Sequence, residues 1–198
     1  QNFADMKYGL DPSFRFAVSR SVYKGMLKYL SNRYGCDYAV QPLPVDHMGV
    51  EFEKDSKVSV SWKAVEDPNE PTAKPTGYIV YKRIGDETFD DGTHVTDLSV
   101  DSGGYIRFHT DIPLGEIVSF KVIAFNDGGM SFPSETVSIG IPKDSRTDST
   151  VLVVNNFDRV SGPAWFEDTE RAGFETEKDS GVSYIRDLTY VGEMYNFR

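Results

Sequence analysis

The middle of the chain alternates apolar and polar residues over short segments, which is the pattern of half-buried β-strands. Turn residues separate these segments, among them Asp67-Pro68-Asn69, Asp91-Gly92 and Asp127-Gly128-Gly129. The pattern predicts seven strands, at about 48–53, 57–64, 77–84, 93–97, 105–111, 117–126 and 134–141. The positions predicted to face inward are Val58, Val60, Trp62, Tyr78, Val80, Ile106, Phe108, Val118, Phe120, Val122, Ala124, Val137 and Ile139. Because no segment of helical period interrupts the strands, the pattern favours a two-sheet sandwich.

Before the strands, apolar residues recur at four-residue steps and predict an amphipathic helix. They are Phe14, Val18, Val22, Met26 and Leu30, and basic residues occupy most of the remaining circumference. Asp11-Pro12 is a favourable helix start, and Gly35 supplies a left-handed stop. The helix has about six turns. We expect its apolar stripe to pack against the sandwich, the C-terminal segment or another domain, with a membrane-surface or partner helix as the alternative.

Two polar or proline-rich stretches divide the chain into three parts. Gln41-Pro42-Leu43-Pro44 and residues 143–150 are predicted as linkers, which gives a helical segment (1–40), a sandwich (41–142) and a C-terminal segment (143–198). In the last part, Val151-Leu152-Val153-Val154 has the character of a buried strand. Residues 168–173 are predicted as a short helix, and residues 183–192 as a helix or strand. We interpret this segment as the start of a further α/β domain.

Composition excludes some classes of protein and leaves others open. Apolar residues at 39% and aromatic residues at 13% suffice for a packed core, and a net charge of −10 argues against binding to nucleic acid. The charge is uneven: +4 over residues 1–34, −10 over 35–142 and −4 over 143–198. No apolar run is long enough to span a membrane, and no signal peptide opens the chain. The single cysteine, Cys36, excludes an internal disulfide bond.

The order of strand signals resembles a fibronectin type III domain. A strand ending on Trp62 is followed by Tyr78-Ile79-Val80-Tyr81, and then by a hairpin with the pattern Val122-x-Ala124-x-Asn126-x-x-Gly129. The resemblance covers residues 42–142 and implies a mainly β fold, an immunoglobulin-like sandwich that here carries an N-terminal amphipathic helix and a partial α/β C-terminal segment. The family usually has a tyrosine where this chain has Val118, and the chain lacks an Arg-Gly-Asp tripeptide.

The N-terminal helix, from Leu10-Asp11-Pro12 to Leu30, resembles the closing helix of zinc-dependent N-acetylmuramoyl-L-alanine amidases. In that family the metal ligands lie upstream, and nothing in this chain matches them. The three histidines, His47, His94 and His109, are widely separated, so no metal site and no cofactor is predicted.

Together, the helix, the sandwich and residues 151–166 (VLVVNNFDRVSGPAWF) resemble secreted bacterial multidomain proteins described as xanthan lyase-like or as cell-wall amidases. The resemblance implies that the chain is the middle portion of an exported protein, located outside the cell, in the periplasm or at the cell surface. It implies flanking domains of the same protein as partners, and polysaccharide or peptidoglycan as a possible ligand.

Four residues of the C-terminal segment are candidates for ligand binding. Asp158 and Arg159 follow the apolar run at its carboxyl end, and Trp165 and Phe166 offer aromatic rings that can stack on a sugar. The alternatives are a loop ion pair and residues of a domain core. No catalytic residue is assigned. The main hypothesis is therefore a non-catalytic structural and interaction module; the alternatives are part of a polysaccharide hydrolase or lyase with its site in this segment, and a glycan-binding module.

Overall fold

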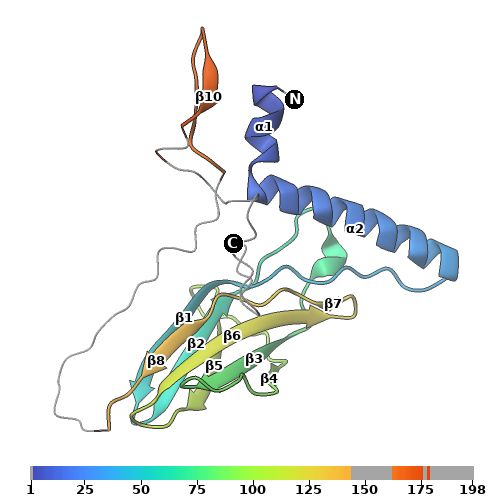
Figure 1. The fold of residues 1–198 in the computed structure, drawn as a ribbon. Coiled ribbons are helices and arrows are strands. Elements are labelled where there is room, and N and C mark those ends of the chain that lie inside the picture. The colour runs from blue at the N-terminus through green and yellow to red at the C-terminus, as the bar shows by residue number, and fades with distance from the viewer. Residues whose placement is uncertain (1, 144–161, 176–177, 179–198) are drawn as a thin grey trace. The chain divides into compact units, whose positions relative to one another are not determined.

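The computed structural model describes residues 2–143, 162–175 and 178, and these ranges form two compact units (Figure 1). Described residues before Tyr34 belong to one unit together with those from Gly162 onward, and residues 34–143 form the other. The first unit is thus discontinuous in sequence, whereas the second is one continuous stretch. The strand predicted at 151–154 and the element predicted at 183–192 lie outside the described residues.

The first unit begins with two helices, α1 (Phe3–Gly9) and α2 (Pro12–Tyr34). The side chain of Asp11 accepts a hydrogen bond from the N–H of Ser13 at 2.8 Å, so it satisfies one of the free donors at the start of α2. Gly35 follows α2 with a φ of 66°, a left-handed conformation that costs glycine little. Both predicted ends of this helix are confirmed. The sequence pattern did not predict α1.

The apolar side chains of α2 are partly exposed, and the packing predicted for them against the sandwich, the C-terminal segment or another domain stays a prediction. Phe14, Val18, Val22, Met26 and Leu30 remain between 44% and 62% exposed. A four-residue spacing advances about 40° around the helix axis at each step. Five such residues spread over about 160° and form a wide surface instead of one narrow stripe.

The second unit is a sandwich of two antiparallel sheets. One sheet has the order β1 (Asp46–Lys54), β2 (Lys57–Lys63), β5 (Ile106–Asp111). The other has the order β4 (Thr93–Val95), β3 (Gly77–Ile84), β6 (Ile117–Asn126), β7 (Gly129–Met130), and β8 (Val137–Gly140) also pairs with β6. A short 3-10 helix, Pro71–Ala73, lies between β2 and β3. The arrangement is that of a fibronectin type III sandwich, so the predicted fold class is confirmed.

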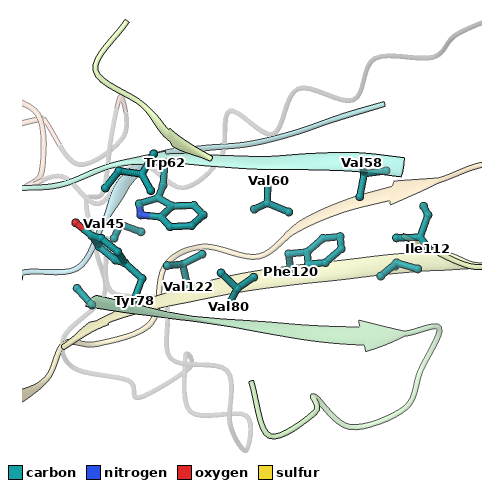
Figure 2. Close-up of a cluster of buried hydrophobic side chains, with 12 residues drawn as sticks. Val45, Val58, Val60, Trp62, Tyr78, Val80, Ile112, Phe120 and Val122 are labelled. Atoms are coloured by element: carbon teal, nitrogen blue, oxygen red, sulfur yellow. The ribbon is translucent and has the colours of Figure 1, made fainter. Parts of the chain in front are cut away.

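The two sheets bury the predicted core between them (Figure 2). Trp62 is completely buried, and its ring meets that of Tyr78 edge to face at a centroid distance of 5.3 Å. The register pairs Tyr78 with Ala124 and Trp62 with Ile106, so inward positions of neighbouring strands lie side by side. Of the predicted inward residues, ten are buried. The other three, Phe108, Val137 and Ile139, are partly buried and pack against the core.

Between β7 and β8, serine hydroxyls replace the backbone carbonyls that a continuous strand would offer to β6, while the N–H groups of Ser131 and Ser134 still donate to the carbonyls of Ala124 and Val122, each at 2.8 Å. The hydroxyl of Ser131 accepts from the N–H of Ala124 at 3.0 Å, and that of Ser134 accepts from the N–H of Val122 at 2.8 Å. The strand predicted at 134–141 is therefore confirmed but shorter, because these hydroxyls satisfy the buried backbone groups without ladder pairing.

The stretch predicted as the first linker packs on the sandwich. Val40, Pro42 and Val45 are fully buried. The hydroxyl of Tyr38 donates to Glu70 at 2.8 Å, and the N–H of Val40 donates to the hydroxyl of Thr72 at 3.1 Å. These buried apolar residues and hydrogen bonds make residues 38–45 part of the sandwich unit.

Asn126, at the end of β6, completes this attachment. Its side-chain amide donates to the carbonyl oxygens of Val40 and Thr72, each at 2.9 Å. We use the term clamp for the group Tyr38, Val40, Glu70, Thr72 and Asn126. Gly128 lies so close to the attached segment that a Cβ there would be 2.6 Å from the carbonyl oxygen of Ala39. Glycine therefore allows the turn and the segment to approach each other.

Candidate functional site

The four candidate residues fall into two groups. Asp158 and Arg159 lie outside the described residues, so their predicted role in ligand binding stays a prediction. Trp165 and Phe166 lie on β9 (Trp165–Glu167), which pairs antiparallel with β10 (Ala172–Phe174). Figure 1 shows this hairpin near the red end of the colour scale.

The helix predicted at 168–173 is wrong, because these residues form the turn and second strand of the hairpin. The Asp168 carboxylate accepts from the backbone N–H groups of Glu170 at 2.9 Å and Arg171 at 2.8 Å. These bonds hold the pKa of Asp168 below its usual value, the one from Glu170 contributing most. Local side-chain hydrogen bonds of this kind favour a turn over a helix.

The hairpin separates Trp165 from Phe166. Successive side chains of a strand point to opposite faces, so the two rings cannot form one flat platform for a sugar. Trp165 lies 6.4 Å from the ring of Phe3, which in turn lies 5.3 Å from the ring of Phe174. Phe166 instead has the guanidinium of Arg171 at 5.8 Å.

Lys7 of α1 lies against the indole of Trp165. Its ammonium is 3.5 Å from the ring centroid, and it forms an ion pair of 3.3 Å with Glu167, two residues along the same strand face. A cation over an indole is stabilised by the negative face of the ring. The indole is 49% exposed, but the lysine occupies the place where a sugar would stack. The contact therefore joins α1 to the hairpin, and a ligand on this face of Trp165 would have to displace Lys7.

The sequence contains a signal for α1 that the apolar pattern alone does not reveal. The side chain of Asn2 accepts from the N–H of Asp5 at 2.9 Å, which is an N-cap interaction. Phe3 and Lys7, four residues apart on this helix, then share the face that meets the hairpin.

Other candidate chemistry is dispersed. His94 lies on the ring of Phe125 at 5.5 Å, and His47 and His109 each lie beside a carboxylate of β1, at 3.2 and 2.8 Å. In the part of the chain that the structure describes, no three His, Cys, Asp or Glu residues gather as a metal site would require. The carboxylate of Asp90 accepts from the N–H groups of Lys82 and Gly92, an ordinary role in a turn.

Within the described ranges, no helix has both the length and the apolar character needed to cross a bilayer.

No family model and no curated protein matches the chain. Among solved structures, it is similar to the twitchin kinase region from C. elegans, at 24% identity and a TM-score of 0.42 over 54% of this chain and 18% of that one. It is also similar to titin kinase and its flanking domains, at 24% identity and a TM-score of 0.40, over 53% of this chain and 18% of that one. A third similarity is to the FN1–FN3 domains of chicken CNTN1, at 18% identity and a TM-score of 0.39, over 52% of this chain and 31% of that one.

Proposed function

We propose that this chain is a spacer and interaction module, not catalytic by itself, within an exported protein that processes carbohydrate or cell wall. The position of the two ends of the sandwich carries the spacer role. Val40, where the chain joins the sandwich, is bound to Asn126 at the end of β6. Gly140, where the chain leaves it, pairs with Ile117 at the start of β6. Ten residues of β6 separate these points, a distance of about 30 Å.

The clamp supports a stiff connection instead of a flexible one. Its hydrogen bonds fix the incoming segment to two loops that are distant in sequence, 70–73 and 126–128. A linker held in this way cannot change its direction without breaking several partly buried hydrogen bonds. The exported, carbohydrate-related context rests on the resemblance of residues 10–30 and 151–166 to secreted bacterial multidomain proteins.

A distance measurement tests the spacer role. Cys36 is exposed and is the only cysteine, so it accepts a spin label directly. A second label is introduced by Glu116→Cys, at an exposed position beside Ile117. We expect a narrow distance distribution with a mean of about 30 to 40 Å, and a broader one when Asn126→Ala opens the clamp. A broad distribution in the unmodified clamp would contradict the proposal.

Incubation with peptidoglycan and with acidic polysaccharides separates the spacer from the two alternatives. A spacer neither retains nor cleaves these polymers. Product release that disappears in an Asp158→Ala variant would favour a hydrolase or lyase. Retention without products, lost in a Trp165→Ala variant, would favour a glycan-binding module.

A further inference from the structure

The outer face of the β3–β6 sheet carries two cations against one aromatic ring. The guanidinium of Arg83 on β3 lies 4.9 Å from the ring centroid of Phe89, and the ammonium of Lys121 on β6 lies 4.2 Å from the same centroid. Lys121 is also 5.5 Å from the ring of Tyr81. Tyr81 pairs with Lys121 across the two strands, so these side chains share the face turned away from the core. We use the term basic patch for Tyr81, Arg83, Phe89, Ile117 and Lys121.

Within residues 2–143, 162–175 and 178, the cations of the basic patch have no carboxylate partner. Among the described residues, no acidic group lies within 4.0 Å of Arg83 or Lys121, although residues 35–142 have a net charge of −10. The Nε atom of Arg83 is buried and has no hydrogen-bond partner among the described residues. Another nitrogen of its guanidinium donates to the hydroxyl of Ser119, at the long distance of 3.5 Å. Burying part of a cation without an anion is unfavourable, and the nearby ring offsets this only in part.

Apolar surface adjoins these cations. Ile117 precedes Ser119 and Lys121 on the same face of β6 and is 63% exposed. Its partners on the neighbouring strand leave it open, because the outward positions of β8 are the small residues Ser138 and Gly140. The surface therefore combines arginine and tyrosine, two residue types enriched in protein interfaces, with a lysine and an exposed aliphatic side chain.

We propose that the basic patch binds an acidic polypeptide that presents carboxylates together with aliphatic side chains. The two cations, which have no carboxylate partner among the described residues, attract anions, and the planar guanidinium suits a carboxylate. Ile117 offers an apolar contact that a polypeptide can match and an acidic polysaccharide cannot. The faces of the patch's aromatic rings are approached by cations, so sugar stacking is disfavoured. The inference deepens the interaction role proposed above and rests on it.

The test uses the whole chain and a short synthetic peptide in which leucine and glutamate alternate. Binding is measured by calorimetry and mapped by amide chemical shifts. A Leu/Gln peptide and polygalacturonate serve as comparison ligands. The patch variant is Arg83→Gln/Lys121→Gln. The matched control is Lys54→Gln/Lys57→Gln, which removes the same charge from two exposed lysines of the other sheet. Thermal unfolding checks that each variant is folded, and Lys121→Gln alone replaces the double variant if Arg83→Gln lowers stability.

Shift changes on β3, β6 and β8 are expected, with affinity that falls about tenfold or more in the patch variant, is unchanged in the control, and decreases with salt. Three results would overturn the inference: no shift changes at the patch, an equal loss of affinity in the control variant, or polygalacturonate binding to the patch as tightly as the peptide. None of these results would alter the distance distribution that tests the spacer role.

Discussion

Replacing Asn126 with alanine should destabilise the sandwich by releasing the segment that precedes β1. The side-chain amide lies 2.9 Å from the carbonyl oxygens of Val40 and Thr72 and 3.2 Å from that of Lys74. Its oxygen accepts from the N–H of Gly128 at 2.8 Å. The two N–H hydrogens share three acceptors and count as about two hydrogen bonds, and the bond from Gly128 is the third. The variant therefore loses about three hydrogen bonds, each of which contributes about 1 kcal/mol to stability.

The free energy of unfolding of the Asn126→Ala variant should therefore fall by about 3 kcal/mol. For a domain of about 100 residues, this lowers the melting temperature by about 15 °C. The assay is urea unfolding followed by the fluorescence of Trp62, which is fully buried. A Trp165→Phe background removes the only other tryptophan. The slope of the unfolding free energy against urea concentration should stay unchanged, because the lost hydrogen bonds are local and the surface exposed on unfolding is the same.

Two further variants make the measurement specific. Asn69→Ala removes an asparagine side chain from an exposed turn and should change stability little. Asn126→Asp keeps the acceptor for Gly128 but places a carboxylate oxygen against the carbonyl oxygens of Val40 and Thr72. It should destabilise the chain at neutral pH more than alanine does. If Asn126→Ala and Asn69→Ala unfold at the same urea concentration, the hydrogen-bond argument for the clamp is refuted.

Three other predictions follow from single sites. Gly128→Ala should lower the free energy of unfolding by about 3 kcal/mol, because the new Cβ forces the adjacent backbone away. Gly104→Ala, at a φ of 78° with no atom near the new Cβ, should lower it by about 1 kcal/mol. Equal urea midpoints for the two variants would contradict this. Burial raises the pKa of Tyr78 to about 12, so the folded state holds this proton more tightly; stability should fall as pH rises from 10 through 12, and phenolate absorbance should show one late tyrosine. The pKa of Asp101 is lowered from 3.8, chiefly by the hydrogen bond from the N–H of Tyr105. The ionised Asp101 carboxylate therefore stabilises the fold above pH 3.8, and this stabilisation is lost as the pH falls through the lower pKa of the folded state. Carboxyl NMR titration and an Asp101→Asn variant can check this.

The strands of the sandwich could be predicted because apolar residues stand at the positions that face the core and polar residues at the positions that face solvent. Positions such as Val58, Val60 and Trp62 alternate with polar residues, and the alternation shows which face is buried. The ends of α2 were also predictable, since Asp11, Pro12 and Gly35 act through local backbone chemistry. The ends of strands were harder to predict where a side chain accepts a hydrogen bond that a backbone carbonyl would otherwise accept, as the hydroxyl of Ser131 does beside β6.

The hairpin and its surroundings could not be predicted in the same way. Strands of three residues, such as β9, are too short to show a period, and the Asp168 turn outweighs the helical appearance of the residues after it. The placement of Lys7 over Trp165 joins residues that are distant in sequence. No local pattern could therefore show that the indole already has a partner on one face.

The sequence by itself determined the main strands of the sandwich, most of the residues of its core and the bounds of the long helix. These depend on interactions between near neighbours and on the burial of one face. Only the tertiary structure decided that residues 38–45 belong to the sandwich, and that Arg83 and Lys121 both lie against Phe89, with no acidic partner among the residues the structure describes. Such contacts depend on the register between strands and on loops that close over long sequence separations, and a local pattern of polar and apolar residues contains no information about either.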